Sequence, residues 1–99
     1  MANHKSATKA HEQSLRRRDR NNRMKSRMRR AIRVTRTAIG AVGGQDEDAV
    51  SAARESIRTT AALIDTLAGK GIIHRNAAAR HKSRLEKRLR RASEPAQDG

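Results

Sequence analysis

The sequence predicts an all-α fold: a three-helix bundle with a long, basic N-terminal helix that projects beyond the core. Three observations lead to this prediction. Apolar residues recur at helical spacing in three stretches, and glycines occupy the breaks between them. The chain has 99 residues, which is enough for one small domain. It has no Phe, Trp, Tyr or Cys, so neither aromatic burial nor a disulfide can stabilise a more complex fold.

The charge balance indicates a polyanionic partner. Lys and Arg number 24 against 10 Asp and Glu, which gives a formal net charge of +14. Self-repulsion at that charge destabilises a compact monomer, and a polyanion relieves it. Of the cations, 18 are Arg, whose planar guanidinium grips phosphate with two hydrogen bonds. Nucleic acid is therefore the first candidate partner, and an anionic membrane is the second.

The cations concentrate at the two ends of the chain. Residues 1–36 hold 13 cations and 2 acids, residues 37–69 hold 2 and 5, and residues 70–99 hold 9 and 3. We therefore expect the partner to contact both ends of the sequence, with a mildly acidic middle between them.

The first predicted helix spans about residues 14–42, or roughly 43 Å. Residues 1–13 carry weaker signals, although Ser6 or Thr8 could begin a helix. One face of the predicted helix is apolar, and its members are Met24, Met28, Ala31, Ile32, Thr35, Ala38, Ile39 and Val42. Arginines at 16, 17, 18 and 20 precede that face and surround the helix. The C-terminal half should therefore pack in the bundle while the N-terminal half projects and frays in the free protein.

The second predicted helix spans about residues 47–68. Gly43 and Gly44 should end the first helix, and Asp46 should cap the second, with the adjacent acids favourable at its positive end. We interpret the acidic cluster as capping, since a metal site would need more ligands. The apolar face is broad and comprises Val50, Ala53, Ile57, Thr60, Ala61, Leu63, Ile64 and Leu67. A helix with so broad a face should lie between two others.

A joint at residues 69–71 (Gly-Lys-Gly) separates the second helix from the third. It is not a Walker loop, because the G-x-x-x-x-G-K-[ST] spacing and a preceding strand are both missing. The next two residues, Ile72 and Ile73, can tuck beneath the end of the bundle.

The third predicted helix, about Asn76–Ala92, has two faces. Its apolar side comprises Ala78, Leu85, Leu89 and Ala92, and its opposite side carries Arg80, Arg84, Arg88 and Arg91. The sequence Ser93-Glu94-Pro95 should end it. We therefore expect one helical-bundle domain over residues 1–92 and a flexible C-terminal tail over residues 93–99.

The histidines do not indicate catalysis. His11-Glu12 lacks the second histidine of a zinc-protease motif, and His81 is expected to be a partly buried structural residue. His74 can bond either backbone or phosphate. The helix N-terminus at Asn76 can be an ordinary cap or a phosphate site, since Lys70 and Arg75 flank it. No catalytic arrangement emerges, so we expect no enzyme, no cofactor and no metal.

The sequence also bears on location. No apolar run approaches transmembrane length, and residues 1–6 lack the apolar core of a secretory signal. We therefore expect a cytoplasmic protein.

Three stretches resemble a known family: residues 1–7 (MANHKSA), residues 24–27 (MKSR) and above all residues 70–85 (KGIIHRNAAARHKSRL). They are similar to the bacterial family of the twentieth small-subunit ribosomal protein, over about residues 1–90. The resemblance implies a three-helix bundle that binds 16S rRNA directly in the body of the small subunit, early in assembly, as a monomer within the ribosome. The acidic turn at residues 43–48 and the tail after Ala92 depart from the family pattern.

Most of the candidate rRNA-binding residues are cations of the first and third helices. They are Lys5, Lys9, Arg16, Arg17, Arg18, Arg20, Arg23, Lys25, Arg27, Arg29, Arg30, Lys70, His74, Arg75, Asn76, Arg80, Lys82, Ser83, Arg84, Arg88 and Arg91. Phosphate contacts position a protein without reading sequence, so specificity should come from RNA shape. The absence of aromatic residues argues against base stacking.

Two rival functions remain. A nucleoid-associated protein that binds duplex DNA would have a similar composition. A membrane-active amphipathic helix would use residues 24–42, but that face lacks Trp and Phe.

Overall fold

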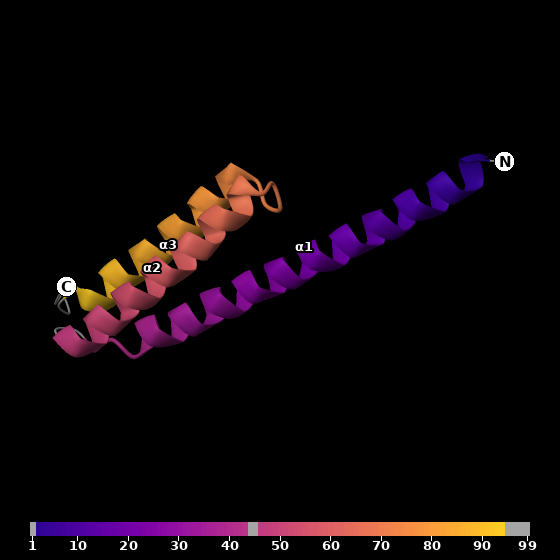
Figure 1. The fold of residues 1–99 in the computed structure, drawn as a ribbon. Helices are drawn as coiled ribbons and strands as arrows, with labels where there is room; N and C mark the ends of the chain where they lie inside the picture. Colours follow the sequence, from indigo (N-terminus) through magenta and orange to yellow (C-terminus); the bar gives the residue numbers. More distant parts are fainter. Residues whose placement is uncertain (1, 44–45, 95–99) are drawn as a thin grey trace.

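The computed structural model describes residues 2–43 and 46–94, with side chains described from residue 7 onward. It contains three helices, α1 (Ala2–Gly40), α2 (Glu47–Gly69) and α3 (Arg75–Ser93), and no strand within the described residues. The helices run up, down and up, with α2 and α3 lying along the C-terminal half of α1 (Figure 1). The predicted all-α three-helix bundle is confirmed.

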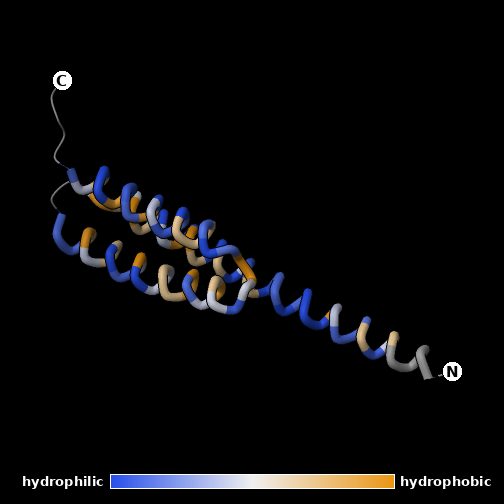
Figure 2. The backbone as a smooth tube through the Cα atoms, turned by 90° about the horizontal axis from the view of Figure 1, so that it is seen from above, coloured by the Kyte–Doolittle hydropathy of each residue, from blue (hydrophilic) through white to orange (hydrophobic). Residues whose placement is uncertain are grey.

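The first helix is much longer than the bundle. Its 39 residues span about 58 Å, and the molecule measures 75 × 21 × 19 Å. Every described side chain from residue 7 to residue 20 is exposed, and the first buried one is Met28. We call residues 2–20 the projecting segment; Figure 2 shows that the coloured part of this segment is mostly hydrophilic. The predicted projection is confirmed.

Both ends of α1 differ from the expected residues 14–42. The helix begins at Ala2, because no glycine or proline interrupts the chain before Gly40. It ends at Gly40, two residues before the expected residue 42. The amides of Ala41 and Val42 bond the carbonyls of Ala38 and Ile39, three residues back, and tighten the last turn. Residues 44 and 45 lie outside the described part of the chain.

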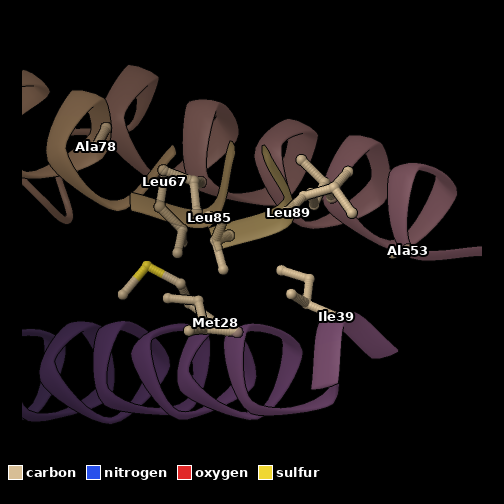
Figure 3. Close-up of a cluster of buried hydrophobic side chains, with 10 residues drawn as sticks. Met28, Ile39, Ala53, Leu67, Ala78, Leu85 and Leu89 are labelled. Carbon is tan, nitrogen blue, oxygen red and sulfur yellow. The ribbon is translucent and has the colours of Figure 1, made fainter. Parts of the chain in front are cut away.

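The core draws apolar side chains from all three helices. Figure 3 shows Met28 and Ile39 pointing from α1 toward leucines of α2 and α3. The buried apolar residues are Met28, Ile32, Ile39, Ala53, Ile57, Ile64, Leu67, Ala78, Leu85 and Leu89. As its broad apolar face predicts, α2 packs against both neighbours, whereas α1 and α3 share a smaller interface.

Three hydroxyl groups form a polar cluster inside this apolar core. Thr35 Oγ1 of α1 lies 2.7 Å from Thr60 Oγ1 and 2.8 Å from Ser56 Oγ, both of α2. Thr35 and Thr60 are buried, at 0% and 3% exposure. Thr60 Oγ1 also donates to the Ala31 carbonyl at 3.4 Å. These bonds form only at one relative position of the two helices, so the hydroxyl cluster fixes the register of α1 against α2.

The turn between α2 and α3 is a Schellman motif. The Gly71 amide donates to the Ala68 carbonyl at 3.1 Å, and the Ile72 amide donates to the Leu67 carbonyl at 3.0 Å. Gly71 adopts φ +75°, a left-handed conformation that side chains disfavour. As expected, Ile72 and Ile73 are half-buried and pack against the core. The turn lies at the end of the bundle from which the projecting segment extends (Figure 1).

The ends of the other two helices follow the sequence closely. Asp46 caps α2 as predicted, because its side chain accepts a hydrogen bond of 3.3 Å from the Ala49 amide. The third helix continues through Ser93, one residue past the expected domain boundary. Glu94 follows as its C-cap, and residues 95–99 of the predicted tail lie outside the described residues.

Candidate nucleic-acid interface

The projecting segment presents exposed cations on more than one side of the helix. Arg16, Arg17, Arg18 and Arg20 are all exposed. Within the described residues the ion pairs are Lys82–Asp65 and Arg58–Glu55, and both lie outside α1. Without a neighbouring helix, the cations of this segment can approach phosphates from any side. The candidate Lys5 falls among the residues whose side chains are not described.

Further along α1 the candidate cations divide between two faces. Arg27 and Arg30 line a groove of about 820 Å³ between α1 and α2, which also contains Glu55 and the exposed Val34. Lys25 is half-buried, while Arg23 and Arg29 are exposed. The predicted residues of α1 therefore do not form a single surface.

The third helix presents its arginine stripe to solvent. Arg80, Arg84, Arg88 and Arg91 are exposed, whereas Ala78, Leu85 and Leu89 on the opposite face are buried. The remaining candidate of this helix, Ser83, is also exposed. The predicted separation of a buried apolar face from an exposed arginine face is thus observed, while anion binding by the arginine face stays a prediction.

A groove of about 390 Å³ between α1 and α3 brings cations of the two helices together. Ile32 and Leu85 are its apolar members. Its other lining residues are all basic: Arg36, His81, Arg84, Lys87, Arg88 and Arg91. No acidic residue of the described chain lines it. We call this site the basic groove.

Three basic residues of the groove, Arg36, His81 and Lys87, were not among the candidate rRNA-binding residues, and His81 was expected only as a structural residue. Lys87 lies about 20° beyond Arg80, at the edge of the arginine stripe on a helical wheel, so the pattern itself could have identified it. Arg36 follows the buried Thr35 on a different helix. Its contribution depends on how α1 and α3 pack, which the sequence pattern does not specify.

His81 is half-buried at this groove, as expected. Burial lowers its pKa from the ordinary value of 6.5, and the nearby positive charges of Arg84, Arg36 and Arg80 lower it further. The lowered pKa favours the neutral imidazole, in which one ring nitrogen can donate a hydrogen bond while the other accepts.

The N-terminus of α3 is capped by His74 and not by Asn76. His74 Nδ1 accepts a hydrogen bond of 3.0 Å from the Asn76 amide, so this histidine bonds backbone. Lys70, Arg75 and Asn76 are exposed around this cap. These residues lie at the same end of the bundle as the projecting segment (Figure 1).

Lys82 differs from the other candidates because its charge is paired within the chain. Its Nζ lies 2.8 Å from Asp65 Oδ1 of α2. The lysine side chain is 37% exposed, and the pair links α3 to α2. Of the candidate cations on α3, Lys82 is thus directed toward the bundle and away from the arginine stripe.

Two classes of feature are not found in the described part of the chain. It holds no group of three His, Asp or Glu side chains placed to bind a metal ion. None of its described helices is both long enough and apolar enough to cross a membrane.

Comparison with known proteins decides the family. The family model described as ribosomal protein S20 matches residues 2–90. The chain belongs to the ribosomal protein S20 family. Members of this family are structural proteins and not enzymes, so the chain is a structural protein as well.

Three relatives illustrate how far the family likeness extends. All three bear the name small ribosomal subunit protein bS20. The Nitrosomonas eutropha protein is 45% identical over 86% of this chain and 91% of its own length. The Nitrosospira multiformis protein is 42% identical over 91% and 97%. The protein from an Azoarcus species is 46% identical over 86% and 90%.

Proposed function

We propose that this chain is a component of the small ribosomal subunit that binds 16S rRNA directly and stabilises its fold during assembly. It acts as a monomer within the ribosome, in the cytoplasm. Its relatives are named as proteins of that subunit, and they match it over most of its length. One structural observation carries the choice of ligand: a 75 Å molecule displays exposed arginines on the projecting segment and on the stripe of α3.

Binding proceeds by phosphate neutralisation. Arginines of the projecting segment and of α3 displace condensed counterions from the RNA. With roughly 6–10 phosphate contacts, affinity should fall about 10³- to 10⁵-fold between 50 and 200 mM salt. Selectivity comes from RNA tertiary shape, because phosphate contacts alone do not read sequence and the chain has no aromatic side chain for stacking.

Competition between 16S rRNA and duplex DNA at one fixed salt concentration tests the proposal. We expect the rRNA to outcompete DNA supplied at the same nucleotide concentration. A nucleoid-associated protein would bind both with equal affinity, and that outcome would refute the ribosomal function. Co-sedimentation of the native protein with small subunits through moderate salt is the corresponding observation in cell extracts.

Two triple variants test the contact surface at equal charge. R16Q/R17Q/R18Q removes three cations from the projecting segment, and R54Q/R58Q/R90Q removes three from the groove between α2 and α3. Glutamine retains helix propensity. We expect the first variant to bind rRNA more weakly and to lower the slope of log affinity against log salt concentration by about three. The second variant should change the affinity and the slope far less. Equal losses would mean that net charge alone drives binding.

A further inference from the structure

The basic groove lies at the least extensive of the three helix interfaces. Fewer residues of α1 and α3 contact each other than contact α2. Arg36 of α1 lines this groove together with Arg84, Lys87, Arg88 and Arg91 of α3. Because no acid lines it, these cations repel one another across the interface.

The groove can also concentrate an electric field. Two of its lining residues, Ile32 and Leu85, are 7% and 2% exposed. Clefts that combine one sign of charge with low-dielectric walls focus the potential and attract counterions. By contrast, the groove between α2 and α3 contains Glu86 among its arginines, so its own acid compensates part of the charge.

We propose that the basic groove is a discrete pocket for a phosphate group, which bridges Arg36 of α1 to Arg84 and Arg88 of α3 and so fastens α1 to α3. The planar guanidinium groups suit a tetrahedral oxyanion because each can donate two parallel hydrogen bonds. The phosphate is either a phosphodiester of rRNA, in which case the inference rests on the proposed function, or a free phosphate ion.

His81 provides a reporter inside this pocket. The cations that face it are Arg36 on α1 and Arg80 and Arg84 on α3, and burial adds to their effect on its pKa. Lys87, Arg88 and Arg91 complete the charged lining. A bound phosphate offsets this positive field, so the His81 pKa should rise toward its ordinary value when the pocket is filled.

The first arm of the test uses the full chain and inorganic pyrophosphate. Thermal unfolding is followed by circular dichroism at the helical band, with sodium chloride of equal ionic strength as reference. At about ten times its dissociation constant, pyrophosphate should raise the Tm by roughly 5–10 °C. The imidazole signals of His81 should shift their titration to higher pH in the same solutions.

Two charge-matched double variants decide whether the groove is responsible. R36Q/R88Q removes one arginine from each helix of the basic groove, and R54Q/R90Q removes one from each helix of the groove between α2 and α3. In sodium chloride alone R36Q/R88Q should be at least as stable as the wild type, since repulsion is relieved. The rise in Tm that pyrophosphate induces should vanish in R36Q/R88Q and persist in R54Q/R90Q.

The second arm measures 16S rRNA affinity of the same two variants. R36Q/R88Q should lose roughly tenfold in affinity, and R54Q/R90Q about twofold or less. If R36Q/R88Q loses rRNA affinity but keeps the pyrophosphate-induced rise in Tm, the pocket binds a phosphodiester. If it loses the rise in Tm but keeps its rRNA affinity, the pocket binds a free phosphate. If the two variants behave alike in both arms, the pocket does not exist. Failure of the ribosomal function appears separately, as equal wild-type affinity for rRNA and DNA.

Discussion

Replacing Thr35 by valine tests whether the hydroxyl cluster stabilises the bundle. Valine keeps the shape of threonine but removes contacts of 2.7 Å to Thr60 Oγ1 and 2.8 Å to Ser56 Oγ. Each hydrogen bond contributes about 0.5–1.5 kcal/mol to stability, and the extra buried methyl group returns roughly 0.8 kcal/mol. Because Thr60 is also buried and keeps only its 3.4 Å bond to the Ala31 carbonyl, we expect a net loss of about 1–2 kcal/mol.

The double variant T35V/T60V sharpens this prediction. Removing both partners leaves no buried hydroxyl at either position, so the double variant should be less destabilised than the sum of T35V and T60V by about 1 kcal/mol. Purely additive losses would show that the two hydroxyls do not interact in solution. A T35V variant that is more stable than the wild type would contradict the prediction, because it would mean that the hydroxyl cluster does not stabilise the bundle.

The assay is thermal and urea unfolding followed by circular dichroism at 222 nm, since the chain is helical and has no aromatic chromophore. A loss of 1–2 kcal/mol should lower the Tm by roughly 4–16 °C in a domain of this size. T59V is the matched control, because the exposed Thr59 hydroxyl bonds only the Glu55 carbonyl of its own helix, at 3.1 Å. It should remain within about 0.5 kcal/mol of the wild type.

Three further predictions concern the turn, the projecting segment and His81. G71A should destabilise the fold by about 1–2 kcal/mol, because φ is +75° at that position. G69A should stabilise the fold by up to about 1 kcal/mol, because Gly69 is the last residue of α2 and has open space around it. Urea unfolding of both variants tests whether the two changes in stability have opposite signs. Amide exchange of residues 16–20 should be fast in the free protein and slow on rRNA, and equal protection in both states would contradict the expected fraying. The lowered pKa of His81 means that the unfolded chain binds its proton more readily. Stability should therefore be fully present above pH 6.5 and fall as the pH drops from there through the folded-state pKa. H81Q should show a smaller loss between pH 7.5 and pH 5 in the same unfolding assay, and an unchanged loss would exclude His81 as its source.

The sequence predicted the helices and their buried faces because both depend on local periodicity. Met28, Ile32 and Ile39 recur at helical spacing, and the structure buries all three. What the sequence could not specify was how the helices meet. Thr35 and Thr60 fell on the predicted apolar faces, but they are 25 residues apart in the chain, and their hydrogen bond depends on the register of the two helices that carry them.

The candidate site shows the same division. The arginine stripe of α3 followed from the helical wheel, since it needs only one helix. The pairing of Lys82 with Asp65 and the approach of Arg36 to the stripe involve two helices each, so they required the packed structure. For His74, the sequence did not distinguish a hydrogen bond to the backbone from one to a phosphate. The bond from the Asn76 amide to His74 Nδ1 depends on the conformation of the turn, which only the structure shows.

The elongated shape explains how so small a core tolerates a net charge of +14. At about 0.1 M salt, exposed charges farther apart than roughly 10 Å are largely screened from one another. In a molecule 75 Å long, cations near the tip of the projecting segment therefore add little to the repulsion at α3. Repulsion stays strong where cations crowd locally, as along the run at residues 16–20 and across the basic groove. A polyanion gains most free energy at these two places, since binding there removes repulsion as well as forming contacts. The segments with the least support from the core are thus the ones that an RNA ligand should stabilise most.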